Sequence, residues 1–183
     1  MFKGELIELG EFELTTPVMR VSDPGYDRDV WCCGTIHDCK VGTWEAAILK
    51  KDQGDWGVRV AVLAVRFKDG GPKFTTINRA MCNATGKWVN SGIDVGVDSG
   101  QAGFYDDTRY RDNSIFDGLT PAKSDFGDEW FNHCCDCTLS SMQAGVIPYG
   151  VVSTSGYGDG SYDCIYHTGK DGLIDFAFII FTD

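Results

Sequence analysis

The chain has 183 residues, of which 43% are hydrophobic and 23% charged, and these proportions predict one globular domain spanning residues 1–183. With 27 acidic against 16 basic residues, its net charge of −11 argues against binding to a nucleic-acid duplex, whose phosphates would be repelled. The absence of a long apolar run and of a signal-peptide core leads us to expect a cytoplasmic protein with no membrane partner.

Period-two alternation predicts strands through the first two thirds of the chain. The strand candidates, in order, are "ELIELGEFELTT" with a break at Gly10, "VMRV", "TWEAAIL" and "WGVRVAVLAVRF". Turn residues follow these strands at "SDPGYD", "KKDQGD" and "KDGGPK", and "FTTI" comes after the last turn. Such short connections are typical of antiparallel sheets.

The last third adds a helix and a final hairpin. Residues 128–142, "DEWFNHCCDCTLSSM", carry apolar side chains at helical spacing. A strand to His167, a turn at "TGKDG" and a strand from Leu173 to Phe181 follow, and the last strand, apolar on both faces, is expected in the centre of a sheet. The predicted fold class is α+β, mainly β, with antiparallel sheets in a sandwich- or barrel-like arrangement and one or two short helices.

Two glycine-rich stretches carry the candidate chemistry. In "IDVGVDSGQAGFYDD", residues 93–107, a strand turns at "DSGQ", where Gly100 can adopt a positive φ and Asp98 can accept hydrogen bonds from turn amides. This stretch is either a hairpin with a capped turn or a polar site. In "STSGYGDGSYD", residues 153–163, the "GDG" is either a tight hairpin turn capped by Asp159 or a set of exposed amides that hold an anion.

We expect these two turns to lie at the same end of one β domain and to form a shared site. The candidate ligand-binding residues are Asp98, Ser99, Gln101, Asp106, Tyr157, Asp159, Ser161 and Tyr162. Tyr105, Tyr157 and Tyr162 would supply aromatic walls. No Walker or dinucleotide-binding motif accompanies the glycines.

The cysteines gather in "WCCGTIHDC" and "NHCCDC". A zinc site would use Cys32, Cys33, His37 and Cys39 with His133, Cys134, Cys135 and Cys137, but the two-residue gap of a zinc knuckle occurs once, between Cys134 and Cys137, and no second pair with this gap accompanies it. We therefore favour reduced structural thiols over a metal site or a redox pair, and expect no metal and no cofactor.

The pattern of these two stretches resembles the bacterial and phage domain-of-unknown-function family numbered 4241. The similar segments are "VGVDSGQAGFYD", the late "SGYGDGSY" followed by a final apolar strand, the "SDPGY" turn and the "WGVRVAVL" strand. Members of that family continue with "YPVY" after the glycine motif, where this chain has "SYDCIY". The resemblance implies that both glycine motifs matter and that the source is a phage or a bacterium, and it implies no reaction.

The function expected first is a non-catalytic protein that binds a small molecule, with a nucleotide signal as one candidate if Arg109, Arg111 or Lys123 makes the pocket basic. Nucleophilic catalysis needs a serine or cysteine beside a base. The chain has no "GxSxG" elbow and only three histidines, so its sequence shows no recognisable nucleophile with a base. Two alternatives stay open. One is a carboxylate- or metal-assisted hydrolase that uses Asp98 and Asp159. The other is an acidic protein that binds a host protein partner, and a homo-oligomer is also open.

Overall fold

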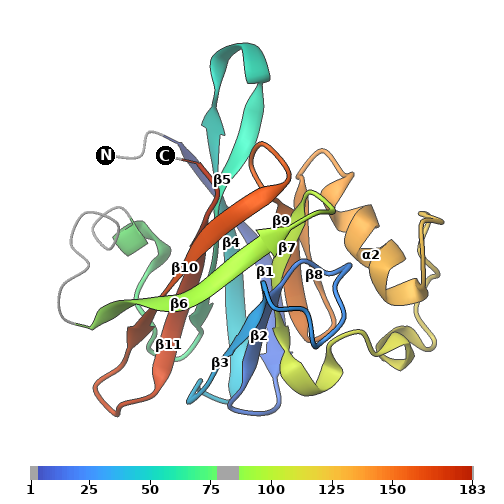
Figure 1. The fold of residues 1–183 in the computed structure, drawn as a ribbon. Coiled ribbons are helices and arrows are strands. Elements are labelled where there is room, and N and C mark those ends of the chain that lie inside the picture. Colours follow the sequence, from blue (N-terminus) through green and yellow to red (C-terminus); the bar gives the residue numbers. More distant parts are fainter. Residues whose placement is uncertain (1–3, 78–86, 183) are drawn as a thin grey trace.

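The computed structural model describes residues 4–77 and 87–182, and it shows two antiparallel sheets packed face to face (Figure 1). The six-stranded sheet has the order β1 (Glu5–Leu14), β4 (Gly42–Asp52), β5 (Val58–Phe67), β11 (Ile174–Ile180), β10 (Gly160–Thr168) and β6 (Trp88–Val97). The five-stranded sheet has the order β3 (Gly34–Ile36), β2 (Met19–Ser22), β7 (Gln101–Asp106), β9 (Gly150–Thr154) and β8 (Ala144–Ile147). The mainly β prediction is confirmed, and the arrangement is a sandwich rather than a closed barrel.

The main hydrophobic core fills the space between the two sheets. Alternate residues of facing strands point into it, among them Leu14, Val21, Trp44, Leu63 and Phe104, all fully buried. Gly10, where the sequence pattern breaks, marks a β-bulge in β1 with a φ of 131°, so one strand continues through the break.

Both sheets are also covered on their outer faces, which explains the strands that are apolar on both faces. A second cluster with Phe176 and Phe178 of β11 lies outside the six-stranded sheet beneath Phe74. Phe74 belongs to a short 3₁₀ turn, Phe74–Thr76. The prediction that the last strand is central is confirmed, because β11 lies between β5 and β10.

Helix α2 (Glu129–Thr138) packs on the outer face of the five-stranded sheet through Trp130 and Cys134 (Figure 1). It begins where predicted, because the Asp128 carboxylate accepts a hydrogen bond from the backbone N–H of Phe131 at 2.9 Å. It ends four residues earlier than predicted, before the serines of "SSM", and the Ser140 hydroxyl bonds back to the carbonyl of Cys137 at 2.7 Å. Within residues 4–77 and 87–182, single 3₁₀ turns also lie at Gly54–Trp56, Asp107–Arg109 and Asn113–Phe116. None of the helices in the described part of the chain is long and apolar enough to cross a membrane.

The hairpin interpretation of the two glycine-rich turns is wrong. The "DSG" turn connects β6 of the six-stranded sheet to β7 of the five-stranded sheet, and residues 155–159 connect β9 back to β10. Each turn is therefore a crossing between the sheets. Period-two alternation predicts strands but does not reveal which sheet a strand joins, so it cannot distinguish a crossing between sheets from a hairpin.

Candidate functional site

The pairing of β6 with β10 brings the two glycine-rich turns together. Gly160 pairs with Val97, and Ser161 pairs with Gly96. Asp98 directly follows Val97 and Asp159 directly precedes Gly160, so the two aspartates flank the same paired position. The prediction that both turns lie at one end of the domain is confirmed by this register. Between them lies a cleft of about 340 Å³, here called the acidic cleft. Its lining includes Tyr26, Trp31, Cys32, Asp94, Asp98, Asp159 and Ser161.

Asp23 holds this end of the molecule in place, and the sequence marked it only as a turn residue. Its fully buried carboxylate accepts hydrogen bonds from the backbone N–H groups of Asp98 at 2.9 Å and Ser99 at 2.7 Å. It also accepts hydrogen bonds from the Ser99 hydroxyl at 2.7 Å and from the backbone N–H of Gly25 at 2.8 Å. Asp23, rather than Asp98, therefore caps the "DSG" turn, which leaves the Asp98 carboxylate exposed. Gly100 has the positive φ expected of it, 71°.

The carboxylates of the acidic cleft have few partners within the protein. Asp159 makes no hydrogen bond or ion pair with another described residue, so it does not cap its turn. Asp94 lies directly opposite Asp163 on the neighbouring strand, an arrangement of like charges that destabilises a sheet. The hydroxyl of Ser161 donates to Asp94, and the side-chain amide of Asn90 donates to Asp163 at 3.2 Å. These two hydrogen bonds offset the repulsion only in part, because neither brings a positive charge.

Aromatic side chains form the other wall of the acidic cleft. Burial, with hydrogen bonds to Asp98 and Cys32, raises the pKa of Tyr26, so its hydroxyl stays protonated. Trp31 is 84% exposed, which is unusual for the largest hydrophobic side chain and leaves its ring open to a ligand.

The basic residues considered from the sequence do not line this cleft. Arg111 forms ion pairs with Asp27 at 3.7 Å and Asp128 at 3.1 Å. Arg109 pairs with Asp112 at 3.4 Å. No lysine, arginine or histidine is among the described residues that line the acidic cleft.

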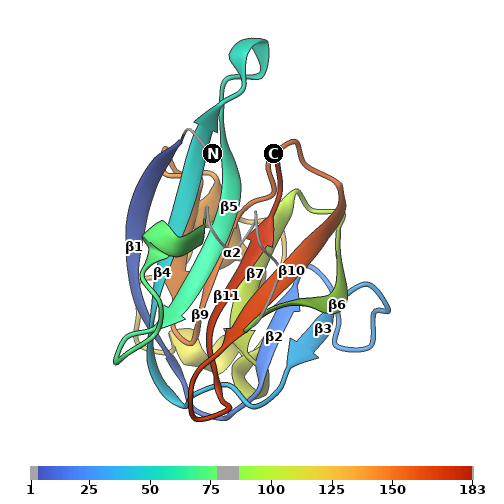
Figure 2. The same ribbon diagram turned by 90° about the vertical axis from the view of Figure 1, so that its left-hand side faces the viewer.

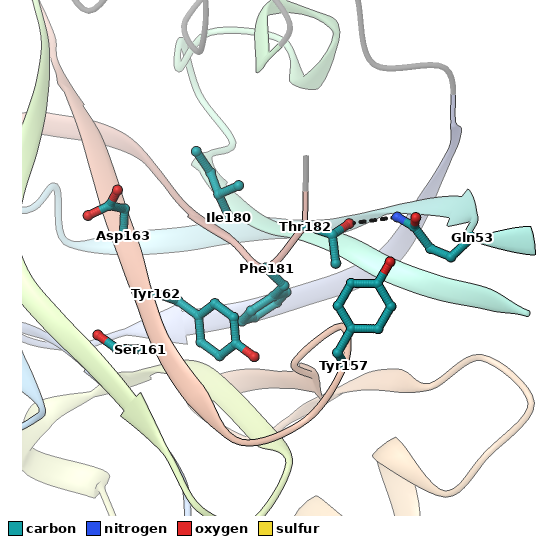
Figure 3. A pocket seen from close by; sticks show the side chains of 8 residues that line it. All are labelled: Gln53, Tyr157, Ser161, Tyr162, Asp163, Ile180, Phe181 and Thr182. Carbon is teal, nitrogen blue, oxygen red and sulfur yellow. Dashed lines mark hydrogen bonds between the residues drawn. The ribbon is translucent and has the colours of Figure 1, made fainter. Parts of the chain in front are cut away.

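A second cleft, of about 690 Å³, lies on the other side of the start of β10 (Figure 3). Its lining includes Gln53, Tyr157 and Tyr162, together with Ser161, which also lines the acidic cleft. The Tyr162 hydroxyl donates to the carbonyl groups of Gly158 at 2.6 Å and Ser155 at 3.0 Å. Tyr162 thus braces the crossing loop, whereas Tyr157 is exposed and meets Trp56 edge-on at 6.0 Å.

Two predicted site residues lie away from both clefts. The side chain of Gln101 is buried under α2, where its amide oxygen accepts the Thr138 hydroxyl at 3.1 Å. Asp106 is fully buried and accepts hydrogen bonds from Thr15 and Thr108. Burial alone would raise the pKa of Asp106, but these hydrogen bonds lower it below its usual value. Both side chains therefore bond to other residues of the chain and line neither cleft.

Tyr105, predicted as an aromatic wall, is likewise fully buried, and it packs against Trp130 of α2. Gly103 has no room for a ligand, because a Cβ there would lie 2.3 Å from the carbonyl oxygen of Val151. The absence of a side chain at Gly103 instead allows β7 and β9 to pack closely against each other.

The two cysteine clusters lie in different parts of the fold. Cys39 belongs to the core between the sheets and Cys134 to the cluster beneath α2. The seven cysteines of the described ranges are free thiols. Within residues 4–77 and 87–182, no group of three or more His, Cys, Asp or Glu side chains is arranged to hold a metal ion.

Comparison of the chain with protein-family models, with characterised proteins and with solved structures finds no match.

Proposed function

We propose that the acidic cleft binds a small organic cation, such as an amine, and that the protein acts by binding rather than by catalysis. The observation that carries the proposal is the convergence of Asp94, Asp98 and Asp159 around Ser161, with no positive side chain of the described chain among them. Carboxylates that converge without a partner cation repel one another, and a bound cation would relieve that repulsion.

The aromatic wall supports the same ligand class. An ammonium group is attracted to the face of an aromatic ring, and Trp offers the strongest such contact. Trp31 is exposed beside the carboxylates, and Tyr26 keeps its phenol neutral. Charge-assisted hydrogen bonds to Asp98 and Asp159 would then fix the orientation of the amine.

A nucleotide suits this cleft poorly, although it was a candidate from the sequence. A phosphate group would enter among three carboxylates and would find no lysine or arginine of the described chain there. The hydrolase alternative gains no specific support, because none of the described residues that line the cleft with Asp98 and Asp159 is a histidine. Membership of the family numbered 4241 and the binding of a host protein stay predictions.

The proposal is tested by thermal-shift and NMR titrations with the amines putrescine and spermidine, compared with AMP and glucose. A ligand bound only by the folded state raises stability, by about 2.7 kcal/mol at a hundred times its Kd. We expect the two amines to stabilise the protein and to shift the amide resonances of residues 94–99 and 158–161. Product analysis of the same mixtures should find the ligand unchanged, and turnover that is lost in Asp98→Asn would favour the hydrolase instead.

Two matched variants separate specific binding from bulk charge. Asp159→Asn removes one negative charge from the cleft and should weaken amine binding about tenfold, equivalent to about 1.4 kcal/mol. Asp125→Asn removes an exposed charge before α2, outside the lining of the cleft, and should leave binding unchanged. Equal losses in both variants, or stabilisation by AMP and not by the amines, would contradict the proposal.

A further inference from the structure

A third cleft, of about 660 Å³, is lined by residues at the opposite end of β10. The turn that joins β10 to β11 at this end is visible in Figure 2. Three lysines and one histidine line the cleft together with two carboxylates: Lys40, Lys87, His167, Lys170, Asp171 and Asp175. We call it the lysine cleft. Its basic character contrasts with a chain of net charge −11.

Backbone contacts bring three distant segments to this cleft. The N–H of Lys40 donates to the carbonyl of Ile174 at 3.0 Å, and the N–H of Thr168 donates to the carbonyl of Lys87 at 3.0 Å. Lys170 lies in the turn between the two strands. The lysine side chains are therefore attached to a hydrogen-bonded frame and not to unrelated parts of the surface.

Both carboxylates of the lysine cleft already have partners. Asp171 forms an ion pair with Lys40 at 2.9 Å, and Asp175 lies 2.6 Å from Nδ1 of His167. Neither Lys87 nor Lys170 forms an ion pair with another described residue. The cleft thus has positive charge in excess, which is the reverse of the acidic cleft.

The His167–Asp175 pair depends on an irregularity of the sheet. His167 pairs with Phe176 and Thr168 with Ile174, so Asp175 is an extra residue in a β-bulge. Ala177 points into the core between the sheets, and strict alternation would turn the Asp175 carboxylate toward the same core. The bulge instead directs it to His167, and bulges often re-aim side chains beside functional sites.

Gly169 leaves the space that this arrangement needs. A Cβ on Gly169 would lie 2.7 Å from Oδ2 of Asp175 and 2.9 Å from Oδ1 of Asp171. Nδ1 of His167 faces Asp175 at 2.6 Å, which leaves the opposite ring nitrogen, Nε2, available for a hydrogen bond with a ligand. His167 is 15% exposed as a side chain, and its ring rests on Trp88 with centroids 4.7 Å apart, so it is held in a fixed orientation.

We propose that the lysine cleft binds a phosphate-type oxyanion, either free or as the terminal group of a small phosphorylated molecule. Lys87 and Lys170 would neutralise its charge, and His167 would donate a hydrogen bond to it. Lysine ammonium groups bind phosphate as point charges, and a histidine oriented by a carboxylate adds direction. This site is separate from the acidic cleft and does not depend on the function proposed for it.

The test is calorimetric titration with inorganic pyrophosphate at low ionic strength, with the amide resonances of residues 167–171 followed by NMR. We expect binding of one pyrophosphate per chain that weakens as salt is added. Lys170→Gln should weaken binding about tenfold or more. Lys123→Gln, which removes an exposed lysine before α2, should leave it unchanged.

Lys170 is exposed in a turn, so the Lys170→Gln variant should fold, and its melting curve checks this. Absence of pyrophosphate binding to the native protein would overturn the proposal. Binding that Lys170→Gln and Lys123→Gln reduce equally would also overturn it, because attraction to the whole surface would then explain the result. Titrations with a sugar phosphate and with inorganic phosphate distinguish a phosphorylated molecule from a free oxyanion as the ligand. Tighter binding of the sugar phosphate indicates that the cleft recognises more than the phosphoryl group.

Discussion

The two ends of β10 differ in how their charges are satisfied. At the Gly160 end, carboxylates converge and no positive side chain of the described chain enters the cleft. At the Thr168 end, each carboxylate has a cation or an imidazole beside it, and lysines remain in excess. The net charge of −11 therefore describes neither site, because local potential depends on which side chains the fold brings together.

The two ends also differ in construction (Figure 2). The acidic cleft forms where the chain crosses between sheets, and one buried carboxylate, that of Asp23, fixes its turn. The lysine cleft forms at a hairpin within one sheet, and a β-bulge aims its histidine–carboxylate pair. Each end should consequently fail through a different change, and that difference can be tested.

The largest effect is expected from Asp23→Ala at the acidic end. The change leaves the N–H groups of Gly25, Asp98 and Ser99 without their acceptor, in a region that is partly shielded from water. Unsatisfied buried donors cost about 1–3 kcal/mol each before water relieves them, so we expect a loss of about 3–4 kcal/mol in the free energy of unfolding. Urea denaturation followed by fluorescence measures it, and amine binding should weaken together with stability.

Asp27→Ala is the matched control for Asp23→Ala. Asp27 lies in the same loop, but its side chain is 88% exposed and 3.7 Å from Arg111. Exposed ion pairs contribute about 0–1 kcal/mol, so this variant should unfold near the native midpoint. If the two variants have equal stability, Asp23 does not hold the turn.

Gly169→Ala should affect the lysine end instead. The added methyl group would press on the carboxylates of Asp175 and Asp171 at less than 3 Å, and overpacking of this kind costs about 1–3 kcal/mol. Because the His167–Asp175 pair must shift, we expect pyrophosphate binding to be lost while amine binding at the other end is kept. Unchanged pyrophosphate affinity in this variant would show that the pair does not shape the lysine cleft.

A smaller contrast is expected within the crossing loop at residues 155–159. Gly158 has a φ of 112° with open space around it, so Gly158→Val introduces backbone strain of about 1–3 kcal/mol without a clash. Asp159→Asn should change stability by less than about 0.5 kcal/mol, since its carboxylate bonds to no other described residue. Melting curves and amine titrations on both variants should therefore separate stability from binding. An Asp159→Asn variant that melts early but binds normally would make Asp159 a structural residue.

The sequence was informative about strands and turns because these depend on local pattern. The alternation in "WGVRVAVLAVRF" predicted β5, and the helical spacing of the apolar residues after Asp128 predicted α2. Both patterns depend on neighbouring residues only, because side chains alternate between the two faces of a strand and recur every three to four residues on one face of a helix.

The same patterns could not predict which sheet each strand joins, because that depends on pairing between distant residues. The hairpin interpretation of "DSGQ" failed for this reason. So did the assignment of Gln101 and Asp106 to the site, since their buried partners, Thr138 and Thr15, are far away in sequence. The pairing of His167 with Asp175 was also missed, because a one-residue bulge is invisible to a period-two pattern.

The last prediction concerns the reactivity of the thiols. Buried and partly exposed cysteines near the two ends of β10 should be alkylated at different rates. Burial raises the pKa of Cys39, the neighbour of Lys40, to about 12, and burial also raises the pKa of Cys164 to about 12. The thiolate is the reactive form, so at pH 8 both cysteines should react with iodoacetamide only as fast as the protein opens. Cys33, in the loop that borders the acidic cleft, is partly exposed and should be alkylated first. Peptide mass spectrometry over a time course measures the three rates, and urea should remove the difference. Equal rates in the native protein would mean that Cys39 and Cys164 are not shielded as the fold requires.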